Sequence, residues 1–123
     1  MEIRAKFWIE NKGEVVLGGG KTKLLLTVER LGSIQRAAAE FGMSYRHAWG
    51  TIQKIEQRVG FKVVETKLGG RDRGARLTPK GRAFVKASDG LFKDLRNAVE
   101  KRFRQKLQSF AQLEEDQHAL VGQ

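Results

Sequence analysis

The chain has 123 residues, which suits one domain with one protruding element. Its formal net charge of +10 favours an anionic partner such as a nucleic acid. It has no cysteine, which excludes disulfides and cysteine-ligated zinc, and no apolar run is long enough for a secretion signal or a membrane span.

The first elements in chain order are a predicted β-hairpin and a helix. Residues 3–10 alternate apolar and polar side chains, as a strand does, and a turn signal at 11–13 separates them from the apolar run 15–17. The glycines at 18–20 are predicted to break the chain. A helix is expected over about 21–31, ended by Gly32, and its inward-facing residues are Leu24, Val28 and Leu31.

Residues 33–59 predict two short helices joined by a tight turn. Ser33 and Ser44 stand as N-caps, and Gly42 ends the first helix in a left-handed conformation. Each helix carries one apolar face, and two helices this close bury their faces only by crossing steeply, as in a helix-turn-helix. An ordinary helical hairpin in a small core is the alternative. The apolar positions are Ile34, Ala37, Ala38 and Phe41 in the first helix and Ala48, Ile52, Ile55 and Val59 in the second.

A wing is predicted next. Residues 61–66 are β-branched and alternating, residues 68–74 form a basic glycine-rich tip, and residues 75–77 return as a short strand. Thr78 and Pro79 then fit the N-cap and the first position of a new helix.

The last predicted helix is long, because no proline follows Pro79. A 123-residue domain is too small to cover its apolar stripe, so we expect the same helix of a second chain to do so. The alternative is that the first turns pack on the core and the end frays. The residues expected at this dimer contact are Leu91, Phe92, Leu95, Val99, Phe103, Leu107 and Phe110.

Several short sequence motifs of the chain are similar to motifs of one protein family. They are Gly32, Ser33, Ile34, Ala37, Ala38, Gly42, Met43, Ser44, Tyr45, Arg46, Ala48, Trp49, Val64, Glu65, Thr66, Gly69, Gly70, Gly74, Ala75, Leu77, Thr78, Pro79, Lys80 and Gly81. On these residues the chain resembles the N-terminal winged-helix domain of the ModE molybdate-responsive regulators, which are allied to LysR-type DNA-binding domains. The resemblance covers about residues 3–95 and implies DNA binding. No oxyanion-binding domain follows the long helix, so no cofactor is expected, molybdate included.

The predicted DNA contacts fall into three groups. The helix over about 44–59 should enter the major groove by its N-terminal half, with Arg46 suited to guanine and Gln53 to adenine. Tyr45 and Trp49 can instead stack under the sugar-phosphate backbone or pack on the hairpin, and Gly50 permits close approach to DNA or to another helix. The helix contacts are Ser44, Tyr45, Arg46, His47, Trp49, Gly50, Gln53 and Lys54. Phosphate contacts are Ser33, Gln35, Arg36 and Lys80, and the wing contacts are Lys67, Arg71, Arg73 and Arg76.

Two features resemble a phosphate-binding loop and a metal site but lack the required spacing, and no catalytic chemistry is predicted. The run Gly18-Gly19-Gly20-Lys21-Thr22 lacks the spacing of a phosphate-binding loop, because Val15 stands where that loop needs glycine. His47 and His118 lie far apart, which argues against a metal site. No nucleophile–base or carboxylate pair has catalytic spacing, so we predict that the chain is not an enzyme.

The sequence as a whole predicts a mostly α protein with a small β component (α+β): a homodimeric winged helix-turn-helix regulator of transcription that binds double-stranded DNA. The predicted parts are the DNA-binding domain over 1–90, a dimerisation helix over 79–113 and a frayed acidic tail over 114–123. The expected location is a prokaryotic cytoplasm, at the nucleoid, with no membrane partner; a separate protein can supply sensing. The alternatives are a non-specific nucleoid protein, a protein-interaction module and, ranked lower, RNA binding.

Overall fold

The computed structural model describes residues 1–67 and 74–121, the last three of these by their backbone alone. Two compact units are present: residues 6–91 form one, and residues 1–5 with 92–123 form the other. Residues 6–91 hold the helix-turn-helix and the wing strands, so the unit that they form carries the site.

A tight hairpin opens this unit. Strands β1 (Trp8–Asn11) and β2 (Glu14–Gly18) pair antiparallel, with Lys12 (φ 53°) and Gly13 (φ 80°) both left-handed in the turn, as a type I′ turn requires. The prediction that the first strand begins at residue 3 is wrong. β2 ends at Gly18, the partner of Trp8, and the chain then turns into a helix, so earlier residues have no β2 backbone left to pair with.

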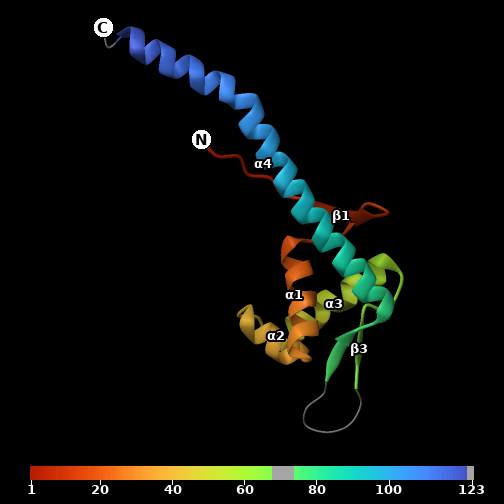
Figure 1. Cartoon of the computed structure of the whole chain (residues 1–123). Coiled ribbons are helices and arrows are strands. Elements are labelled where there is room, and N and C mark those ends of the chain that lie inside the picture. The colour runs from red at the N-terminus through yellow and green to blue at the C-terminus, as the bar shows by residue number, and fades with distance from the viewer. Residues whose placement is uncertain (68–73, 122–123) are drawn as a thin grey trace. The chain divides into compact units, whose positions relative to one another are not determined.

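Three helices follow: α1 (Gly19–Leu31), α2 (Ile34–Glu40) and α3 (Tyr45–Val59). Figure 1 shows them as one helical body. Gly19 and Gly20 were predicted to break the chain but form the first turn of α1, where no side chain crowds them. The predicted caps are confirmed: the Ser33 and Ser44 hydroxyls accept the amides of residues 36 and 47, each at 3.1 Å.

The predicted apolar faces of α2 and α3 supply the centre of the core. Phe41 is the exception: it was expected to face inward but is 39% exposed, because α2 ends at Glu40 and Phe41 is its C-cap. Leu31 is likewise only partly buried at the end of α1, whereas the buried face of that helix includes Leu25, which the prediction omitted. The core residues from these helices are Leu24, Leu25, Val28, Ile34, Ala37, Ala38, Ala48, Ile52 and Ile55.

The wing strands β3 (Val64–Thr66) and β4 (Ala75–Leu77) pair antiparallel and project from the helical body (Figure 1). The predicted tip, residues 68–73, lies outside the described residues. β3 begins at Val64, later than predicted, and at its start the Glu56 carboxylate accepts hydrogen bonds from the amides of Val63 and Val64, at 2.8 and 3.1 Å.

Glu29 of α1 is hydrogen-bonded to the second wing strand, β4. Its carboxylate accepts the Leu77 amide at 2.7 Å and the Arg82 guanidinium at 2.7 Å. Burial alone would raise the pKa of the Glu29 carboxyl, but these two donors outweigh burial and hold that pKa below its ordinary value. Glu29 therefore remains charged at neutral pH and links α1, β4 and the start of the next helix.

The last helix, α4, runs over Pro79–Val121. The Thr78 hydroxyl caps it by accepting the Gly81 amide at 2.9 Å, as predicted from the Thr-Pro pair. The helix continues past residue 113, where the prediction placed a frayed tail, because glutamate, glutamine and alanine favour helix and no glycine or proline intervenes before residue 122. No helix in the described ranges combines the length and the apolarity that crossing a bilayer requires.

Candidate nucleic-acid interface

An open groove of about 1040 Å³ runs between the helix-turn-helix and the wing. One wall is the turn between α1 and α2 with the start of α2, another is the start of α3, and the third is the base of the wing. The groove is lined by Leu31, Gly32, Ser33, Ile34, Gln35, Arg36, Ala39, Tyr45, Trp49, Thr66, Lys67, Gly74 and Ala75.

The wing is hydrogen-bonded to the helix-turn-helix at this groove: the Ala75 amide donates to the Gly32 carbonyl at 2.8 Å. Within the wing, the Lys67 amide donates to the Gly74 carbonyl, also at 2.8 Å. Gly32 has φ 66°, the left-handed conformation that directs the chain from α1 into α2. The base of the wing is therefore held in place relative to α2.

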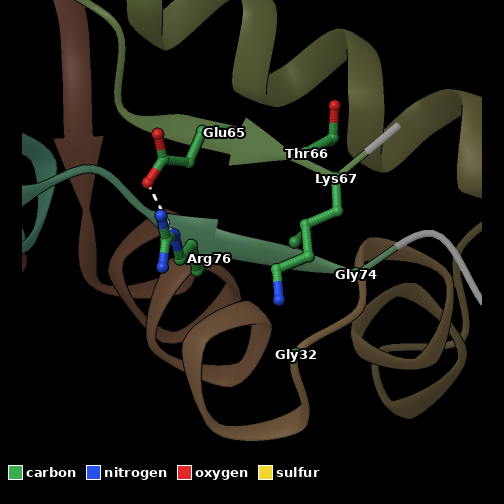
Figure 2. Close-up of a pocket in the computed structure, with 7 residues that line it drawn as sticks. Gly32, Glu65, Thr66, Lys67, Gly74 and Arg76 are labelled. Carbon is green, nitrogen blue, oxygen red and sulfur yellow. Dashed lines mark hydrogen bonds and ion pairs between the residues drawn. The ribbon is translucent and has the colours of Figure 1, made fainter. Parts of the chain in front are cut away.

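Lys67 and Arg76 occupy different environments on the wing. Figure 2 shows Lys67 crossing β4 toward the turn at Gly32, and its Cδ lies 3.7 Å from where a Cβ on Gly74 would stand. Arg76 instead forms an ion pair with Glu65 across the strands, with 2.6 Å between Nε and Oε1 (Figure 2). Lys67 has no such pairing among the described residues, so it is the better placed of the two to bind an anion.

The exposed face of α3 carries the predicted base-reading side chains. Tyr45 is 47% exposed, and Arg46, Gln53 and Lys54 are also exposed. Within the described parts of the chain, no hydrogen bond or ion pair engages the side chains of Arg46 and Gln53. Polar side chains that are exposed and unpaired on one helix face are free to bind base edges.

The two aromatic residues of α3 differ in burial. Trp49 is partly buried: it packs against the core and also lines the groove. Tyr45 lines the groove without joining the core. With Ala39, they give the groove an apolar wall between the cations Arg36 and Lys67.

The groove brings together only part of the predicted site. Ser33, Gln35, Arg36, Tyr45, Trp49 and Lys67 line it. Ser44, Arg46, His47, Gly50 and Gln53 lie on the adjoining α3 surface, and Ser44 is engaged as the cap of that helix. Arg71 and Arg73 lie outside the described residues.

Of the other two predicted cations, Lys80 lies elsewhere and Lys54 belongs to the exposed face of α3. The ammonium of Lys80 stands over the Phe61 ring, 4.6 Å from its centroid, in a cation–π contact away from the groove lining. The charge of Lys54 acts on Lys21 of α1: burial first, and then the charges of Arg58 and Lys54, lower the pKa of the Lys21 ammonium. Thr66, which the sequence indicated only as part of a family motif and not as a DNA contact, has an exposed side chain in the groove.

Comparison with known proteins places the chain in a family. Residues 21–82, about half of the chain, match the bacterial regulatory helix-turn-helix proteins of the lysR family. The chain belongs to the LysR family. The match begins in α1 and ends in the first turn of α4, so it contains the whole groove described above.

The predicted resemblance of this LysR-family chain to ModE proteins is confirmed. It is 35% identical to the molybdenum-pterin-binding protein MopA of Rhodobacter capsulatus over 63% of this chain and 29% of that protein. It is 33% identical to the molybdenum transport protein ModE of Azotobacter vinelandii over 66% of this chain and 30% of that protein. The chain thus spans less than a third of the length of these relatives.

Solved structures share the fold of this LysR-family chain. A complex of the CbnR DNA-binding domain with DNA matches 69% of this chain and 92% of that domain, with a TM-score of 0.56 and 24% identity. The BenM DNA-binding domain bound to benA site 1 DNA matches 69% of this chain and 91% of that chain, with a TM-score of 0.54 and 20% identity. The predicted winged helix-turn-helix class is confirmed.

Proposed function

We propose that this LysR-family protein is a sequence-specific regulator of transcription that binds double-stranded DNA through α3 and the groove beside it. The observation that carries the proposal is the exposed face of α3, which presents Arg46 and Gln53 with no intramolecular partner among the described residues. A major groove about 12 Å wide admits one helix, and its base edges match those two side chains.

The groove beside α3 supports phosphate binding on both sides of that helix. Arg36 at the start of α2 and Lys67 on the wing bring positive charge to opposite walls. The N-terminus of α3 adds its own partial positive charge, and no acidic residue lies in its first turn. These contacts position the duplex but carry no sequence information.

Binding to a selected duplex and to random duplexes can be compared to distinguish base contacts from phosphate contacts. We expect Arg46→Ala to weaken binding to a duplex selected by the wild-type protein from a random pool by about 1–3 kcal/mol, and to change random-duplex binding little. Lys67→Ala should weaken both about equally, because it removes a phosphate contact. Fluorescence anisotropy with both duplexes measures this, and Lys23→Ala, which removes an exposed cation from α1, is the control.

Equal losses on selected and random duplexes for Arg46→Ala would contradict the base-reading role. Failure of the pool to yield any preferred duplex would favour the non-specific nucleoid alternative instead.

We further propose that the protein is a homodimer held by α4. Phe92, predicted at this contact, is instead buried within the single chain (3% exposed). Phe103 and Leu107 are half-buried, and Phe110 and Leu113 are 45% and 61% exposed, at spacings of three or four residues. Such a stripe on a long helix is typical of a helix that pairs with another. The symmetric partner of a homo-oligomer is a second copy of the same stripe.

The dimer is tested by placing one charge in the stripe and one outside it. We expect Phe103→Glu to convert the dimer to a monomer at micromolar concentration, because the carboxylate would be buried against apolar side chains. Gln105→Glu, an exposed position on the opposite side of the helix, adds the same charge and should leave the dimer intact. Light scattering measures the mass, and a monomeric wild-type protein would contradict the proposal.

A further inference from the structure

Gly50 lies in the middle of α3, where glycine is unfavourable. A glycine inside a helix is less stable than an alanine there, because it loses more backbone freedom on folding. A Cβ built on Gly50 would meet no atom of the described residues within 4 Å. Packing within the described chain therefore gives no reason for the missing side chain.

Four other glycines of the described chain have a structural reason that Gly50 lacks. Gly32, Gly42 and Gly60 have positive φ values of 66°, 64° and 86° at turns and helix ends, where a side chain would be strained. Gly81 lies against Val63, whose backbone leaves no room for a Cβ. Gly50 is helical and faces open space, so neither reason applies to it.

The position of Gly50 on α3 suggests what its missing side chain leaves room for. Arg46 stands four residues before it, and Gln53 and Lys54 stand three and four residues after it, so the helix period places all of them on one face. Those three side chains are exposed. Gly50 is thus the low point of the face that is proposed to enter the DNA, with longer polar side chains on either side along the helix.

We propose that Gly50 is a specificity-determining residue: its bare backbone lets α3 come close enough to a base pair in the major groove for Arg46 and Gln53 to reach the base edges. This inference rests on the proposed function. A side chain at this point would hold the helix away from the groove floor. Phosphate contacts from the groove walls would persist, because they do not depend on the depth of insertion.

The test is Gly50→Ala, with Gly90→Ala as its matched control. Gly90 is a second helical glycine, exposed in α4, with nothing within 4 Å of a Cβ. Both variants should raise the melting temperature by about 2–8 °C, since each replaces a glycine in an exposed helix. Only Gly50→Ala should lower the affinity for the selected duplex, by about tenfold or more, with random-duplex binding changed less than about twofold.

The outcomes separate this inference from the proposed function. If the wild-type protein binds the selected duplex and Gly50→Ala binds it equally tightly, the role of Gly50 is overturned and DNA binding stands. A Gly50→Ala variant that melts below the wild type would also overturn it, because the space would then not be free. If Gly50→Ala became monomeric but bound DNA as tightly as the wild type, the space at Gly50 would accommodate another helix and not DNA, and the proposal would be overturned. A wild-type protein that binds neither duplex would overturn both.

Discussion

Raising the salt concentration from 50 to 200 mM is expected to weaken DNA binding by about 10³–10⁵-fold, if about 6–10 phosphates are neutralised. The physical reason is counterion release: each cation that binds a phosphate frees a condensed counterion, and that gain shrinks as bulk salt rises. Of the 24 lysines and arginines, 17 lie in residues 6–91, the unit that carries the groove, and none lies after residue 106. Anisotropy titrations across the salt range measure the slope.

The slope also distinguishes single contacts. Lys67→Ala should reduce the slope of log affinity against log salt by about one, because one phosphate contact is lost. Lys23→Ala, on α1 outside the groove lining, should leave the slope unchanged. A wild-type affinity that hardly responds to salt would show that the cations do not meet phosphates, and the proposed mode of binding would then be wrong.

Gly81→Ala is expected to destabilise the protein by about 1–3 kcal/mol, which is a large part of the stability of a small domain. A Cβ at this position would overlap the Val63 carbonyl oxygen and lie 2.8 Å from the Val63 Cα. Both are backbone atoms of a fully buried residue, and that carbonyl also accepts the Thr78 amide at 2.9 Å. The start of α4 must therefore move away from the segment that leads into β3.

Urea unfolding followed by circular dichroism measures this loss. Gly90→Ala is again the control, because it makes the same substitution in the same helix without a neighbouring atom, and it should increase stability. The two variants should therefore shift the unfolding midpoint in opposite directions. A Gly81→Ala variant as stable as the wild type would show that the first turn of α4 can separate from Val63 at little cost.

Local signals in the sequence were enough for the helix-turn-helix. Ser33 and Ser44 cap their helices, Gly42 takes the left-handed conformation, and the apolar faces of α2 and α3 are buried, all as predicted. These features depend on residues three or four positions apart, so the chain encodes them locally. The mistake on those faces, Phe41, came from extending the helical period beyond the residue where α2 ends, and Val59 at the end of α3 is only partly buried.

The ends of the strands could not be predicted from local sequence patterns in this way. A strand needs a partner, and the partner lies elsewhere in the chain. Alternation alone predicted a first strand from residue 3, but β2 ends at the partner of Trp8. In the wing, β3 begins only at Val64, where Glu56 of α3 accepts hydrogen bonds from the amides of Val63 and Val64, and no alternation pattern predicts this contact.

The sequence by itself determined the class of fold, the two capped helices and the cationic, exposed face of α3, because helix period, capping and charge act over a few residues. Only the tertiary structure decided which predicted cations are free. Lys67 borders the groove, whereas Arg76 pairs with Glu65 and Lys80 covers Phe61. It also showed that Gly81 is required by packing and that Gly50 is not. Both distinctions depend on which distant segments meet, since long-range packing assigns each side chain its neighbours.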